Sequence, residues 1–81
     1  MKTIDYQTTG TCSRAIHITL TDDDRLSDVI FDGGCHGNLQ GIGALVRGMK
    51  REEVIRRLQG IDCKARGTSC PDQLAKALSQ A

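Results

Sequence analysis

Four cysteines are the residues of this sequence whose chemistry stands out. They are far apart along the chain, with separations of 23, 28 and 7 residues, at Cys12, Cys35, Cys63 and Cys70. A cysteine thiolate binds soft metal ions such as zinc, holds iron–sulfur clusters and attacks electrophiles. The spacing lacks the C-x-x-C knuckle of zinc fingers, so a shared site depends on the fold bringing the four thiols together.

Each cysteine is expected at the end of an element. Cys12 falls in a Gly-Thr-Cys-Ser break between two strands, and Cys35 follows a strand and precedes a helix. Cys63 lies in a short connection, and Cys70 begins the last helix. Unpaired N–H groups at the start of a helix favour a thiolate, which applies to Cys35 and Cys70. We therefore predict a site built from loops at one end of a sheet, with all four thiols as metal ligands.

The two histidines receive different interpretations. His36 directly follows Cys35 and is the candidate for an additional ligand, although a polar loop residue is the commoner role at such a position. His17 lies between Ile16 and Ile18, so its side chain points away from theirs and is predicted to face solvent.

The first third of the chain has the alternation of β-strands. Apolar and β-branched residues alternate over residues 4–8 and again over residues 16–20, on either side of the break that contains Cys12. A third strand is predicted over residues 26–32, and its Val29-Ile30-Phe31 centre is expected to be partly buried on both faces.

After Gly33-Gly34 the apolar residues between Leu39 and Met49 recur every three or four positions, which predicts a helix. Asn38 is the predicted N-cap and Gly48 the predicted end. Gly41 and Gly43 weaken a helix, so their presence indicates a closely packed neighbour.

Two more helices follow in the prediction. One runs from Arg51 to Gln59 and ends at Gly60, and the other begins within Thr68-Ser69-Cys70-Pro71-Asp72, capped by Ser69. Three strands followed by three helices predict an α+β fold, in which a three-stranded antiparallel sheet has the helices packed on one face. The 81 residues are expected to form a single domain.

The composition argues against several classes of function. A formal net charge of +1 and a content of one Tyr, one Phe and no Trp make nucleic acid an unexpected partner, because neither a basic surface nor a stacking platform is available. We find no apolar stretch of membrane-spanning length and no secretory signal peptide, so a membrane is not an expected partner and the predicted location is the cytoplasm. Thiols stay reduced in that compartment.

The stretch Thr68-Ser69-Cys70-Pro71-Asp72-Gln73-Leu74-Ala75 is similar to the signature of the TSCPD domain family. Matches over residues 31–42 and 60–63 extend this resemblance to essentially the whole chain. Members of the family occur as small free-standing proteins and as a C-terminal module of cobalamin-dependent ribonucleotide reductases. The resemblance implies a link to ribonucleotide reductase and DNA synthesis. Reductase activity is not expected of this chain alone, because 81 residues cannot enclose a nucleotide, a cobalamin and a radical path.

A more distant resemblance is to the NifU-type iron–sulfur assembly scaffolds. It rests on Cys12 after the first strand, on Gly34-Cys35 before a helix rich in small residues, and on Arg66-Gly67-Thr68-Ser69-Cys70 at the last helix. Cys63 has no counterpart in that pattern. The resemblance implies a NifU-type fold and a connection to cluster assembly.

These observations together predict a small metal-binding accessory or carrier module, with zinc or an iron–sulfur cluster as its cofactor. Two alternatives stay open. One is a thiol-based sulfur or redox carrier, in which Cys35 or Cys70 acts covalently without a metal. The other is a metal-free interaction module that docks on a ribonucleotide reductase. The expected partners are accordingly a ribonucleotide reductase, or an iron–sulfur or sulfur-transfer protein.

Overall fold

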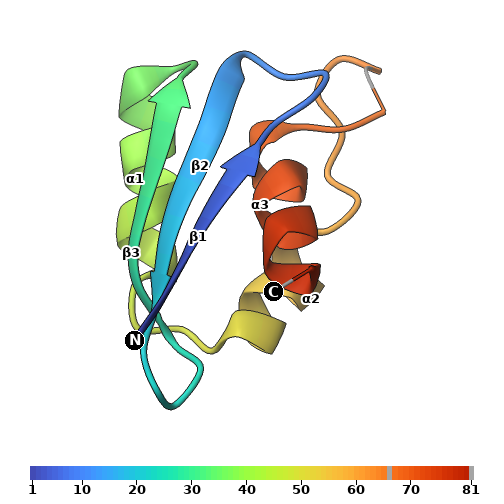
Figure 1. Cartoon of the computed structure of the whole chain (residues 1–81). Coiled ribbons are helices and arrows are strands. Elements are labelled where there is room, and N and C mark those ends of the chain that lie inside the picture. The colour runs from blue at the N-terminus through green and yellow to red at the C-terminus, as the bar shows by residue number, and fades with distance from the viewer. Residues whose placement is uncertain (66, 81) are drawn as a thin grey trace.

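A computed structural model describes residues 1–65 and 67–80 of the chain (Figure 1). The elements follow one another as β1 (Lys2–Gln7), β2 (Ser13–Leu20), β3 (Leu26–Gly33), α1 (His36–Val46), α2 (Arg51–Leu58) and α3 (Cys70–Ser79). The predicted order of three strands and three helices, and with it the α+β class, is confirmed. Arg66, which the NifU-type resemblance uses, lies outside the described residues.

The three strands form an antiparallel sheet in the order β1-β2-β3, with β2 in the middle. Ile18 stands opposite Ile4 of β1 and Val29 of β3. Side chains alternate between the two faces of a strand, and Ile16, Ile18 and Leu20 are all buried on the same face. His17 is exposed on the other face, where its Nδ1 lies 2.7 Å from Asp5 Oδ1. The prediction that His17 faces solvent is confirmed.

The helices pack on the face of the sheet that presents these aliphatic side chains. α1 lies against β3, α3 lies against β2, and α2 packs on α3. Val54 of α2 and Leu74 and Leu78 of α3 are fully buried in the resulting core. Within residues 1–65 and 67–80, none of the helices has the length and apolar character that crossing a bilayer requires.

The centre of β3 differs from its prediction. Val29 is buried, but the side chain of Ile30 is 56% exposed. The helices cover a single face of the sheet, so consecutive residues of β3 alternate between the core and solvent. The expectation of burial on both faces was wrong for this reason.

The start of α1 also differs from its prediction. The N-cap is Cys35, three residues before the predicted Asn38, and the helix begins at His36. Gly33 and Gly34 both have left-handed backbone angles, with φ of 83° and 86°. This conformation suits glycine and turns the chain directly from the end of β3 into the helix.

The two glycines inside α1 have different surroundings. A Cβ atom added at Gly43 would lie 3.0 Å from the carbonyl oxygen of Val29, so the predicted close approach is confirmed at this position. The same construction at Gly41 meets no atom within 4 Å. Gly43 therefore allows α1 to sit tightly against β3, whereas Gly41 lies on the open side of the helix.

Candidate functional site

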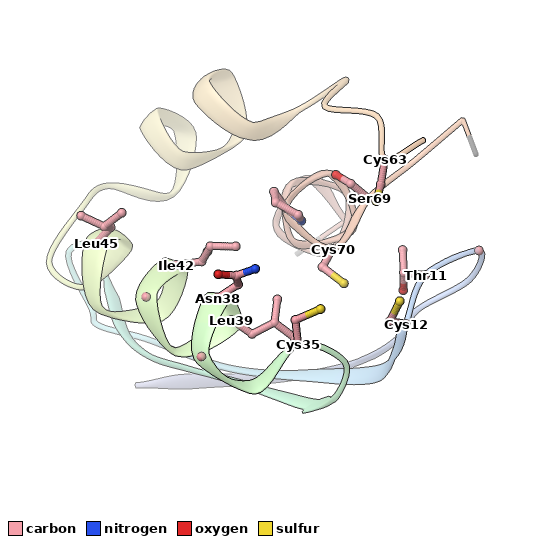
Figure 2. A pocket seen from close by; sticks show the side chains of 14 residues that line it. Thr11, Cys12, Cys35, Asn38, Leu39, Ile42, Leu45, Cys63, Ser69 and Cys70 are labelled. Carbon is pink, nitrogen blue, oxygen red and sulfur yellow. The ribbon is translucent and has the colours of Figure 1, made fainter. Parts of the chain in front are cut away.

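All four cysteines line one cleft of about 530 Å³ (Figure 2). They reach it from the β1–β2 loop, the start of α1, the loop before α3 and the start of α3. Leu39, Ile42 and Leu45 of α1 contribute an apolar wall. The fold thus brings four thiols that are distant in sequence to a single surface feature, while their role as metal ligands stays a prediction.

The four thiols do not have equivalent positions in the cleft. Figure 2 shows the sulfur atoms of Cys12, Cys35 and Cys70 directed toward a common space. Cys63 lies beside the segment that leads into α3, where its backbone N–H donates to Thr68 O at 3.1 Å. Cys12, Cys35 and Cys63 are exposed, whereas Cys70 is half-buried. Cys12, Cys35 and Cys70 therefore form the inner set, and Cys63 stands next to it.

Local structure explains how the two helix-terminal thiols are presented. Cys35 is the N-cap of α1, and its own side chain makes no capping hydrogen bond. Cys70 is the first residue of α3, directly after the cap Ser69, whose hydroxyl accepts a hydrogen bond from Asp72 N at 3.1 Å. The predicted cap of the last helix is confirmed. Each thiol therefore stands where the backbone N–H groups of a helix start point outward.

The donor chemistry of the cleft fits a thiophilic metal, since thiolates are the ligands of structural zinc and of iron–sulfur clusters. The side chains are not yet gathered around a common centre. Across residues 1–65 and 67–80, no three His, Cys, Asp or Glu side chains form a group that could hold a metal ion. A metal would therefore require the thiols to draw together by rotation of the side chains or a shift of the loops.

The structure does not bring His36 into the cleft. Its side chain lines a separate groove between β3 and α1, where Gln40 Nε2 donates to His36 Nε2 at 2.8 Å. Cys35 is the N-cap and His36 the first helical residue, so the two adjacent side chains diverge. His36 is consequently no neighbour of the thiols, although it is adjacent to one of them in sequence.

The start of α3 contains a buried polar cluster that the sequence did not predict. The carboxylate of Asp72 accepts hydrogen bonds from Thr68 Oγ1 at 2.6 Å and from Gly60 N at 2.7 Å, and Lys76 Nζ lies 3.2 Å away. Gln73 Nε2 donates to Thr68 Oγ1 at 2.9 Å. The sequence signal for this cluster is the pair Thr68 and Asp72, which lie about one helical turn apart on either side of Cys70.

This cluster ties together the segments on which the thiols stand. Gln73 Oε1 accepts from Thr9 N at 3.1 Å, which attaches the β1–β2 loop and hence Cys12 to α3. Asp72 attaches Gly60, at the end of α2, to the same helix start. Thr68, Ser69, Asp72 and Gln73 are all buried, although Ser69 also lines the cleft, and Cys70 and Pro71 line it from half-buried positions. The polar residues of the motif are therefore structural, and they support the thiol that lies among them.

Hydrogen bonding keeps Asp72 ionised in this buried position. The hydroxyl of Thr68 lowers the pKa of Asp72 most, followed by the backbone N–H of Gly60, and these outweigh the effect of burial, which raises it. Lys76 adds a smaller lowering effect. A carboxylate that accepts several hydrogen bonds is stabilised in its charged form, which explains how a buried acid fits here.

A comparison with protein families matches residues 2–81 to the sequence pattern described as the TSCPD domain. Comparisons with curated proteins and with solved structures give no match. The more distant NifU-type resemblance therefore stays a prediction.

Proposed function

This chain belongs to the TSCPD domain family, and we propose that it is a small accessory or carrier module that binds zinc or an iron–sulfur cluster through its cysteines. One observation carries the proposal: Cys12, Cys35, Cys63 and Cys70 come from four separate segments and line one cleft. Thiols outside the hydrophobic core on four separate segments have no packing reason to share a surface. A common thiophilic ligand supplies that reason.

In this proposal the inner set of Cys12, Cys35 and Cys70 supplies the first ligands, and Cys63 completes a four-thiolate site. When bound, zinc would supply a redox-inactive tetrahedral centre, and a cluster would supply exchangeable iron and sulfide. The chain's own contribution is to hold the thiols at an open surface. Openness favours a centre that is exchanged with a partner over one that only holds the fold together.

The partner we propose is a ribonucleotide reductase, or an iron–sulfur or sulfur-transfer protein. Support comes from the occurrence of the family module at the C-terminus of cobalamin-dependent reductases. The apolar wall of the cleft also supports a protein partner, because it continues along α1 to Leu45, which is 79% exposed at the end of the cleft away from the thiols (Figure 2). A contiguous apolar surface that stays exposed is typical of protein interaction sites.

The second candidate function is a thiol-based sulfur or redox carrier without a bound metal. It is favoured by the exposure of Cys12, Cys35 and Cys63 and by the absence, among the described residues, of a group already arranged for a metal. In such a carrier a single exposed thiol would accept and release the transferred group, and the other three would be dispensable.

Anaerobic purification, followed by metal and sulfide analysis and an absorption spectrum, tests the proposal. We expect about one zinc per chain without a visible band, or iron with acid-labile sulfide and a brown colour. Protein that stays metal-free, even after incubation with zinc or with ferrous iron and sulfide under reducing conditions, would exclude the metal-binding proposal and favour the second candidate.

Single substitutions identify the ligands. Cys12→Ser, Cys35→Ser and Cys70→Ser should each abolish or strongly reduce metal content, and Cys63→Ser should reduce it less. His36→Ala is the matched control, because His36 neighbours Cys35 in sequence but lines another groove. Metal content that falls in His36→Ala but not in Cys12→Ser would contradict the proposed ligand set.

A further inference from the structure

Ser13 places a hydroxyl group against the sulfur atom of Cys70. Its Oγ lies 3.3 Å from Cys70 Sγ, within hydrogen-bond distance for sulfur, although 57 residues separate the two along the chain. Ser13 begins β2 and Cys70 begins α3, so the contact joins the sheet to the last helix at the cleft. Ser13 is only 4% exposed, which leaves its hydroxyl few alternative partners.

The neighbours of Ser13 orient its side chain. Thr8 Oγ1 donates to the carbonyl oxygen of Ser13, and Thr11 Oγ1 lies 3.2 Å from both that oxygen and Ser13 Oγ. These contacts fix the backbone of Ser13 at the edge of the cleft. A deprotonated cysteine has no proton to give and can only accept hydrogen bonds. Whenever Cys70 is a thiolate, the hydroxyl of Ser13 is therefore the donor in this pair.

We infer that Ser13 is a positioning residue of the cysteine cleft: its hydroxyl is hydrogen-bonded to Cys70 Sγ, as the donor whenever Cys70 is a thiolate, and fixes the direction in which that sulfur points. The inference rests on the proposed function only for the identity of the ligand, because the hydrogen bond acts on Cys70 with or without a metal. It also distinguishes the thiols, since Cys70 is the half-buried member and Cys12, Cys35 and Cys63 are exposed.

Hydrogen bonds from the surroundings of a ligand hold it in the orientation that a metal requires. Loss of such an outer hydrogen bond lowers metal affinity by about 10- to 100-fold in other metal sites. In iron–sulfur proteins the same kind of bond to a sulfur atom also tunes the cluster. A fixed Cys70 would act as the ligand around which the exposed thiols close.

The first test measures the side-chain rotamer of Cys70 in the reduced, metal-free full-length chain. Nuclear magnetic resonance couplings between its α and β protons should report a single rotamer in the wild type. Ser13→Ala should give averaged couplings, and Ser13→Thr, which keeps the hydroxyl, should restore the single rotamer. Ser79→Ala is the control, because the hydroxyl of Ser79 bonds to Ala75 O in the same helix.

The second test measures zinc affinity in the same four proteins by competition with a chelator. Ser13→Ala should bind zinc about tenfold more weakly, at the low end of the effects seen for outer hydrogen bonds. Ser13→Thr should recover most of the affinity, and Ser79→Ala should equal the wild type. The charge-transfer absorption of the cobalt-substituted protein should change in Ser13→Ala alone, which a general loss of stability would not produce.

The two tests separate this inference from the proposed function. If the chain binds no metal, the proposed function fails, and the couplings still decide whether Ser13 orients Cys70. Averaged couplings in the wild type, or a single unchanged rotamer in Ser13→Ala, would overturn the inference. Because the first of these outcomes is measured on the wild type, it applies even if Ser13→Ala does not fold.

Discussion

The aliphatic core and the cysteine cleft lie in the same small fold, but the side chains of the core are buried whereas most of the thiols are exposed. Ile16, Val54 and Leu74 have no exposed surface and lie between the sheet and the helices. Cys12 and Cys35 are exposed next to the ends of elements, and Cys63 is exposed in the loop between α2 and α3. The fold therefore closes its core without using the thiols. Residues that secure the structure and residues available for chemistry are separated in space.

The segment Thr68–Asp72 is the place where the two regions meet. Thr68, Ser69 and Asp72 are buried and hydrogen-bonded, while Cys70 and Pro71 are half-buried and line the cleft together with Ser69. This short motif thus contains mostly structural residues around one cysteine that our proposal makes a metal ligand. Substitution of the structural residues should change stability, and substitution of Cys70 should change ligand binding.

The largest expected effect is on the core. Leu74→Ala should lower the free energy of unfolding by about 3 kcal/mol, because it removes a fully buried side chain and leaves a cavity. Leu45→Ala makes the same chemical change at a position that is 79% exposed and should cost less than about 0.5 kcal/mol. Urea titration of both variants measures the difference. Equal losses would contradict the separation of core from cleft.

Asp72→Ala should have the next largest effect. The buried hydroxyl of Thr68 and the backbone N–H of Gly60 would lose their acceptor, and we expect a loss of about 2 kcal/mol of unfolding free energy. Asp32→Ala removes an exposed carboxylate paired with Arg14 and should change stability by less than about 0.5 kcal/mol. Denaturation of the metal-free proteins gives both values.

Asp72 should also make the free energy of unfolding depend on pH in the acid range. The pKa of Asp72 is lower in the folded chain than its ordinary value, so the ionised carboxylate stabilises the fold fully above about pH 4, its unfolded value. This stabilisation is lost as the pH falls through the lower, folded pKa. The wild type should therefore lose more stability than Asp72→Asn between pH 5 and pH 2, in about the range set by these pKa values. Parallel acid-induced slopes in the two proteins would show that Asp72 is not responsible.

The smallest expected effect on stability is at the thiols. In the metal-free protein, Cys12→Ser and Cys35→Ala should each change the free energy of unfolding by less than about 0.5 kcal/mol, because the side chains are exposed. If zinc is added, the wild type should become more stable than either variant, since ligand bound to the folded state stabilises it. A large loss of unfolding free energy in the metal-free variants would show that these thiols stabilise the fold.

The sequence predicted the elements well because their signals are local. Alternation over residues 16–20 and the cap at Ser69 depend on neighbours within a few positions. The errors were also informative. Asn38 was the wrong cap because Gly33 and Gly34 turn the chain earlier, and Ile30 is exposed because the helices cover only one face.

The sequence by itself determined the order of three strands and three helices and the location of Cys35 and Cys70 at helix starts, since periodicity and capping act over short stretches of chain. Only the tertiary structure decided that four distant thiols share a cleft, that His36 faces another groove, and that Ser13 contacts Cys70. These relations depend on how the helices pack on the sheet. That packing is set by the shape of the whole core, which no local pattern records.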